Sequence, residues 1–197
     1  MKTPIAIVLL SVTLIGFAAS ALAGEGHSAT QKAQATHEMV ELGELLDTVA
    51  RNSGKEFLVD RRVPAEVVVG TLKARDLDYA MFLTVLRNNG LAAIPSDKTV
   101  KVIPVGNVRQ YAPPMLREND AAVPDDEWVT RVIKVENTNA VKLVSLLRPM
   151  IQQAGHLAAD SDANKLVIVA PYGVTVRVAE VVDEIDVPAV RTQTPQQ

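Results

Sequence analysis

Cysteine is absent from the 197-residue sequence, which excludes disulfide bonds, thiolate metal sites and thiol nucleophiles. Aromatic residues are scarce, with three Phe, three Tyr and one Trp. Dense clusters of Lys and Arg are also lacking, and 20 basic against 23 acidic residues give a formal net charge of −3. Proteins that bind nucleic acid through its phosphates usually carry a basic face, so nucleic acid is a poor candidate partner. The hydrophobic content of 48% nevertheless indicates a folded chain.

Motifs for catalysis or metal binding are missing as well. The three histidines have no partner at metal-ligand spacing. Residues 160–164 resemble the opening of a calcium loop, but Lys165 and Pro171 stand where glycine and glutamate are needed, so an acidic turn explains them better. Neither a nucleophile elbow nor a glycine-rich phosphate loop occurs. We therefore expect no enzyme and no cofactor, and a small-molecule site would need a convergent pocket in the structure.

The N-terminus has the pattern of a secretory signal over residues 1–23. Lys2 gives a positive start, residues 5–17 are almost wholly apolar, and Ala21 and Ala23 are small residues at the two positions that a signal peptidase reads. We expect cleavage after Ala23. An uncleaved membrane anchor is the alternative, although the apolar segment is shorter than the ~20 residues that span a bilayer. No later segment is long and apolar enough to cross a membrane.

Two folded stretches with a polar break between them follow the signal. Residues 24–36 are small and polar and are expected to form a flexible lead-in. Residues 37–106 and 127–187 carry the patterns of helices and strands. Residues 107–126 combine prolines with acidic residues, which predicts a solvated interdomain linker. Residues 188–197 are expected to form a loose tail.

In the first stretch the pattern predicts the order helix, strand, strand, helix, strand, strand. Apolar residues at helical spacing from Leu42 to Ala50 predict a helix that Gly54 ends in a left-handed cap. Gly70 is expected to mark a bulge. The other expected elements are strands at 57–59 and 67–72, a helix capped by Asp76 or Asp78, and a hairpin of 91–94 with 100–103.

The second stretch repeats the order of helix, glycine, strand, turn and strand. After a strand at 128–135, an apolar face from Leu143 to Ile151 predicts a helix that Thr138 or Asn139 caps and Pro149 ends or kinks. A hairpin is expected at 156–159 and 165–170. Residues 174–185 fit both strand alternation and helical spacing, and we interpret them as a helix. The fold class is α+β, with two small α/β sandwich modules in tandem, each near the size at which a single core is marginal.

Both modules carry a resemblance to a known family. Residues 42–104 resemble the first periplasmic N-domain of the bacterial secretins, the outer-membrane channels of type II secretion and related machines. The matching pieces are residues 45–50, 53–55, 57–60, 67–69, 85–86, 89–91 and 100–104. Residues 128–186 resemble the second secretin N-domain, with matching pieces at 130–135, 139–140, 146–149, 162–168 and 185–186.

The resemblance implies a fold and a compartment. The first module would be similar to the signalling domain of TonB-dependent transducers, and the second would be KH-like, both in the periplasm. In the family, the first N-domain docks the inner-membrane platform and the second packs subunits into a ring. This chain departs from the family in three places: residues 34–40 are polar, Pro64-Ala65-Glu66 replaces a usual glycine, and the sequence ends at Gln197, before the barrel of a full secretin.

These observations predict a stand-alone periplasmic docking module of a secretin-based export machine. Its partners would be the secretin, an inner-membrane platform component or cargo, and a monomer is favoured because ring formation in the family draws on the barrel. Candidate interface residues are Arg61, Arg62, Val67, Val69 and Thr71, with the strand pairing at a sheet edge. Routine sheet packing and a solvated turn are the simpler interpretations of these residues. A periplasmic signalling module is the alternative function.

Overall fold

Residues 38–188 are described by the structure, which is a computed structural model. The predicted signal segment, the lead-in and all but the first residue of the predicted tail lie outside the described residues. Within 38–188, none of the helices combines the length and apolar character needed to cross a bilayer.

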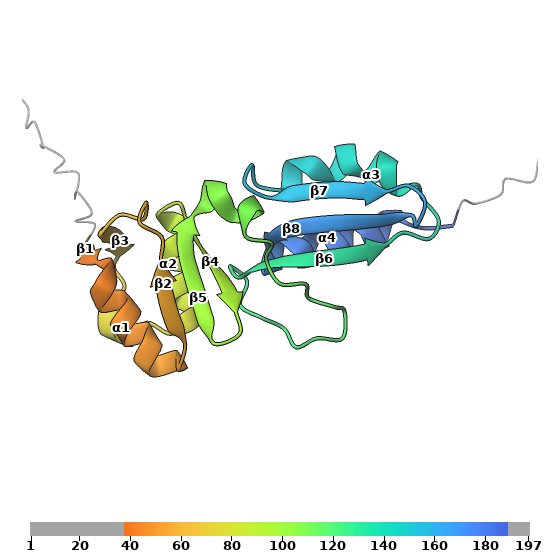
Figure 1. The fold of residues 1–197 in the computed structure, drawn as a ribbon. Coiled ribbons are helices and arrows are strands. Elements are labelled where there is room, and N and C mark those ends of the chain that lie inside the picture. Colours follow the sequence, from red (N-terminus) through yellow and green to blue (C-terminus); the bar gives the residue numbers. More distant parts are fainter. Residues whose placement is uncertain (1–37, 189–197) are drawn as a thin grey trace, which may run out of the picture. The chain divides into compact units, whose positions relative to one another are not determined.

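The first module packs two helices against a two-stranded and a three-stranded sheet (Figure 1). Strands β1 and β3 are antiparallel, and the larger sheet has the order β2-β5-β4, with β2 parallel to β5. The elements are β1 (Glu38–Glu41), α1 (Leu42–Ser53), β2 (Glu56–Val59), β3 (Glu66–Gly70), η1 (Ala74–Asp76), α2 (Tyr79–Asn88), β4 (Leu91–Ser96), β5 (Thr99–Pro104) and η2 (Val105–Gln110).

Local chemistry explains where these elements begin and end. Gly54 adopts a left-handed φ of 66° and its N–H bonds to the carbonyl of Ala50, which confirms the predicted cap of α1. The carboxylate of Asp78 accepts the N–H of Met81 at 2.7 Å and so caps α2. Gly70 has a φ of 72° and adjoins an irregularity in the β1–β3 register, as the expected bulge requires. Strand β1 was missed because its sequence is too polar to signal a strand.

The second module is an antiparallel sheet of order β6-β8-β7 whose buried face shares one apolar core with two helices (Figure 1). The ambiguous segment is helical, as predicted. Helix α3 ends at Leu147, and Pro149 lies in the 3-10 turn that follows. The elements are β6 (Trp128–Lys134), α3 (Ala140–Leu147), η3 (Arg148–Met150), β7 (His156–Asp160), β8 (Lys165–Pro171) and α4 (Tyr172–Ile185).

The segment between the modules differs from the solvated linker that the sequence predicts. Its middle, residues 117–122, is exposed, but both ends are docked. Val108 and Trp128 are buried in one apolar cluster with Ile94. At the other end, the Asp126 carboxylate accepts hydrogen bonds from Arg87 at 2.7 Å and from Thr84 at 2.8 Å. Apolar residues at the ends of the acidic run explain the difference, because they bury their side chains against the sheets.

Candidate docking surfaces

Strand β3 presents a different residue from those predicted. Val67 and Val69 are 1% and 5% exposed and belong to the core of the first module, whereas Val68 between them is 38% exposed. This follows from the alternation of side chains along a strand. Thr71 is exposed but lies just beyond the end of β3. A partner at this strand would therefore contact Val68 and Thr71, whereas Val67 and Val69 would pack in the core beneath the strand.

The backbone of β3 is also occupied on the side away from β1. The N–H of Val68 donates to Asn89 Oδ1 at 2.8 Å, and Asn89 Nδ2 donates to the carbonyl of Val68 at 2.9 Å. The same amide nitrogen reaches the carbonyl of Val85 at 2.8 Å, which ties the strand to α2. A side-chain amide has the donor and acceptor of a peptide group, so Asn89 replaces a neighbouring strand at this point. A partner strand would have to displace it.

The two arginines after β2 have different roles. Arg62 is held by Asp60 through two side-chain bonds of 2.9 Å and a backbone bond of 3.0 Å. These bonds from Arg62 hold the pKa of the Asp60 carboxyl far below its usual range, and the Tyr111 hydroxyl donates to the same carboxyl at 3.3 Å. Arg61 is exposed and forms no salt bridge within residues 38–188. Of these two arginines, Arg61 is therefore the one whose charge is not paired with a described acidic residue.

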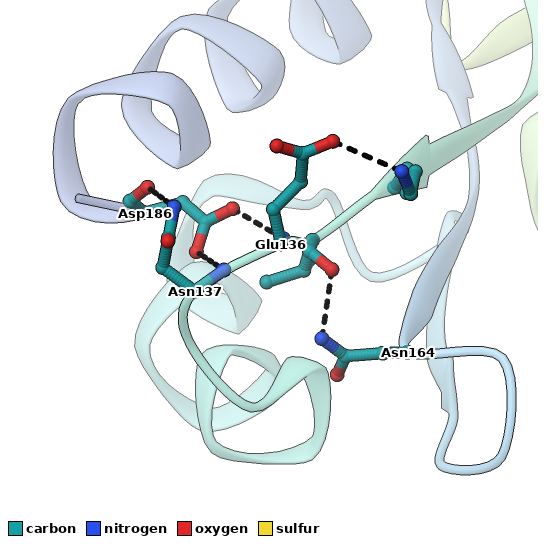
Figure 2. A network of polar contacts seen from close by, with 6 residues as sticks. Glu136, Asn137, Asn164 and Asp186 are labelled. Carbon is teal, nitrogen blue, oxygen red and sulfur yellow. Dashed lines mark hydrogen bonds and ion pairs between the residues drawn. The ribbon is translucent and has the colours of Figure 1, made fainter. Parts of the chain in front are cut away.

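A network of polar contacts fixes the loop between β6 and α3 (Figure 2). The Asp186 carboxylate accepts the backbone N–H groups of Glu136, Asn137 and Thr138. These bonds, that of Glu136 first, lower the pKa of Asp186. The residue just after α4 therefore anchors the loop just after β6.

Asn164 joins the same loop to the turn between β7 and β8 (Figure 2). Its side chain accepts the N–H of Ala140 at 2.9 Å and donates to the carbonyls of Val135 and Thr138 at 2.7 and 2.9 Å. Its φ of 49° is left-handed, a conformation that asparagine tolerates better than most residues. The sequence marked Asn164 as part of an acidic turn and of the family resemblance, and Asp186 only as a point of family resemblance. An asparagine that ends an acidic turn is the local signal for the left-handed residue, but nothing local indicates its distant partners.

Further contacts cross from the first module to the second. Arg109, in η2, donates to the carbonyls of Gln153, Ala154 and Gly155 at 2.6, 3.3 and 2.7 Å. Sequence reasoning missed this clamp because its partners lie more than 40 residues away in the chain.

The carboxyl of Glu127 and the hydroxyl of Tyr79 are buried next to each other, beside β6. Glu127 is 7% exposed, and burial raises the pKa of its carboxyl. Burial, followed by the charge of Glu127, raises the pKa of Tyr79. Lys55 Nζ lies 4.8 Å from the centroid of the Tyr79 ring, which places a positive charge near the pair. The Tyr79 hydroxyl has no hydrogen-bond partner within the described part of the chain.

The described residues do not gather acidic or metal-ligating side chains at one place. Within residues 38–188, no group of three or more His, Asp or Glu side chains could hold a metal ion. The shifted carboxyls of Asp60 and Asp186 face an arginine and backbone amides, and Glu127 faces a tyrosine, at three separate places. General acid–base catalysis requires such groups to converge on one cavity.

Comparison with known proteins identifies both modules. Residues 37–102 match the GspD-like N0 domain, and residues 130–191 match the bacterial type II/III secretion system short domain. The chain is 28% identical over 148 residues to the secretin XcpQ of Pseudomonas aeruginosa, which covers 74% of this chain and 22% of that protein. It is 30% identical over 173 residues to the secretin ExeD of Aeromonas hydrophila, which covers 85% of this chain and 25% of that protein. It spans about a quarter of these curated relatives.

A solved structure agrees with this assignment. A chain of the Klebsiella pneumoniae type II secretion system outer membrane complex, which contains PulD, PulS and the PulC HR domain, has a TM-score of 0.61 at 26% identity, over 77% of this chain and 26% of that one. The family consists of protein-transport components rather than enzymes, and its N-domains are periplasmic. The chain therefore carries two secretin N-domains, a GspD-like N0 domain followed by the bacterial type II/III secretion system short domain.

Proposed function

We propose that residues 38–188 act as a periplasmic docking module of a type II secretion machine and bind a protein partner without chemical reaction. The observation that carries the proposal is the succession of two secretin N-domains in the family's order. The Klebsiella complex holds the PulC HR domain together with PulD, which supports a component of that class as the partner. The secretin ring itself and exported cargo are the other candidate partners.

The geometry supports contact through the first module at its exposed positions. Arg61 supplies a charge, and Val68 supplies apolar surface on a strand whose backbone is already satisfied by Asn89. A partner would therefore recognise side chains here. A signalling role remains second, because it would draw on the first module alone and leave the second without a function.

Cross-linking in the envelope of the host tests the proposal. Tagged chain should recover a secretin, an inner-membrane secretion component or cargo. Arg61→Glu should reduce recovery, whereas the matched reversal Arg75→Glu, at another exposed site of the first module, should not. Recovery of an outer-membrane receptor or an anti-sigma regulator would favour signalling, and no reproducible partner would overturn docking.

A further inference from the structure

The outer edge of β6 is paired at only one point. This strand ends its sheet, and on the side away from β8 a single bridge within the described residues joins Met115 to Thr130. The N–H of Thr130 donates to the carbonyl of Pro114 at 2.8 Å, and Leu116 donates to the carbonyl of Thr130 at 2.9 Å. Residues 114–116 therefore lie on the edge as a short parallel strand.

The chain then leaves the edge. The carboxylate of Asp120 accepts the N–H of Arg117 at 2.7 Å, and the N–H of Asp120 donates to the carbonyl of Arg117 at 3.1 Å. These two hydrogen bonds form a turn. In Figure 1 the segment before β6 loops away from the strand beyond this point. The pairing that begins at Thr130 is not continued by any described segment.

The remaining edge has free backbone groups. In an antiparallel pair, the peptide groups of alternate residues point toward the neighbour and away from it. Both groups of Thr130 point outward, so those of Val132 and Lys134 do as well. The outward groups of Val132 and Lys134 bond to no other residue in 38–188, and the Val132 side chain is 40% exposed. An open edge of this kind is a template for an added strand.

A hollow with a volume of 450 Å³ lies beside this edge. Four segments line the hollow: β6 itself, the segment before β6 at Glu118, the loop that Asp186 anchors (Figure 2), and the last turns of α4. The residues that line it are Glu118, Arg131–Lys134, Glu136, Asn137, Ala179, Asp183 and Asp186.

The charges of the hollow favour a basic occupant. Glu136 pairs with Lys134 at 2.9 Å, and the Asp186 carboxylate is taken up by three backbone N–H groups. Glu118 and Asp183 are exposed and form no salt bridge with a described residue, and Arg131 is the only basic residue of the lining outside the ion pair. The lining thus contains two carboxylates and one guanidinium that form no salt bridge with a described residue.

We propose that the β6 edge beyond Thr130 binds an extended segment of a partner protein. The segment pairs with the outward groups of Val132 and Lys134 and places a basic side chain near Glu118 and Asp183. It continues the pairing that residues 114–116 begin. The proposal deepens the docking function and rests on it for the identity of the partner, but the pairing chemistry stands on the edge itself.

Peptide binding to the full chain tests the site. The probe is a short peptide of alternating valine and threonine with two lysines, and the matched control carries glutamates in place of the lysines. Amide chemical shifts in NMR should change at Val132 and Lys134, and the lysine peptide should bind about fivefold or more tightly than the control. Shifts confined to another edge, or equal affinity for the two peptides, would overturn the proposal.

Two pairs of variants sharpen the test. Val132→Pro removes an outward donor without breaking the β6–β8 ladder, and Val132→Thr keeps that donor. The proline variant should weaken the lysine peptide about fivefold to tenfold and the threonine variant should not. If proline unfolds the chain, the affinity for the lysine peptide is compared between Asp183→Lys and Glu184→Lys. Both residues are on the same helix, but only Asp183 lines the hollow, so only Asp183→Lys should weaken binding. Unchanged affinity in Asp183→Lys contradicts the site.

The same variants separate this inference from the proposed function. If Val132→Pro loses both the envelope cross-link and the binding of the lysine peptide, the result supports the docking function and the β6 edge as its site. Loss of peptide binding with the cross-link intact shows that docking uses another surface, which overturns this edge as the partner site but leaves the docking function in place.

Discussion

Two edge strands of this molecule are treated in opposite ways. On β3 the outward groups of Val68 are bonded to the side chain of Asn89, whereas on β6 the outward groups of Val132 and Lys134 stay open beyond the bridge at Thr130. One asparagine is enough to close an edge, because its amide offers both a donor and an acceptor. An edge left open next to an acidic hollow is therefore informative, since folded proteins usually protect such strands.

The polar side chains of the two modules also differ in what they hold. Asn89 holds an edge and one helix carbonyl in the first module. Asn164 and Asp186 hold the β6–α3 loop from two distant parts of the second module. Removal of each residue should therefore have a different cost.

Asn164→Ala should have the largest effect. It removes three side-chain hydrogen bonds, leaves part-buried backbone groups of Val135, Thr138 and Ala140 without a partner, and places alanine at a left-handed φ. We expect the free energy of unfolding to fall by about 2–3 kcal/mol, measured by denaturant with Trp128 fluorescence. Asn164→Asp keeps one acceptor, and its free energy of unfolding should lie between those of the parent and Asn164→Ala. A loss no larger than that of Asn89→Ala would break the comparison.

Asp186→Asn should have the second largest effect on stability, and this effect should depend on pH. Backbone hydrogen bonds lower the pKa of Asp186 in the folded chain below its ordinary value of 3.8, so the carboxylate contributes stability above that pH. The contribution is lost as the pH falls through the folded pKa. The melting temperature of the variant should lie below that of the parent at pH 7, and the gap should close on acidification. A gap independent of pH would contradict this account.

Asn89→Ala should cost less, about 1 kcal/mol, because two of its three hydrogen bonds are exposed to solvent. It should also open the β3 edge. Hydrogen exchange should quicken at the amide of Val68 and stay unchanged on β6, and sedimentation should show more self-association than for the parent. Unaltered exchange at Val68 would mean that Asn89 does not protect the edge.

Arg62→Ala should have the smallest effect on stability. The Arg62 side chain is half exposed in its ion pair with Asp60, and ion pairs at the surface contribute little. The NMR titration of Asp60 should nevertheless shift toward its ordinary pKa, since Arg62 is the main cause of the lowered value. Arg61→Ala is the matched control and should leave the Asp60 titration unchanged.

Periodicity and capping residues predicted most elements, including the cap at Gly54 and the helical character of α4. For the other two helices the sequence offered two caps each, and the structure has Asp78 rather than Asp76 and Asn139 rather than Thr138. These patterns failed at β1, whose four residues are too polar to signal a strand, and at the ends of the interdomain segment. The candidate interface on β3 stays a prediction, but Val67 and Val69 are buried and Val68 is exposed, because spacing shows which residues alternate and not which set faces the core.

The sequence by itself determined the fold class and the succession of helices and strands in the two modules, because hydrophobic periodicity and local caps act between near neighbours in the chain. The likeness to secretin N-domains rests instead on the matching pieces of sequence in both modules. The tertiary structure decided everything that depends on distant partners: Asn89 on β3, Asp186 under the β6–α3 loop, Arg109 on three carbonyls of the second module, and the open part of β6. A hydrogen bond or a free edge exists only when the backbone of another element is placed beside it or kept away. That placement follows from packing of the whole fold, which no short segment encodes.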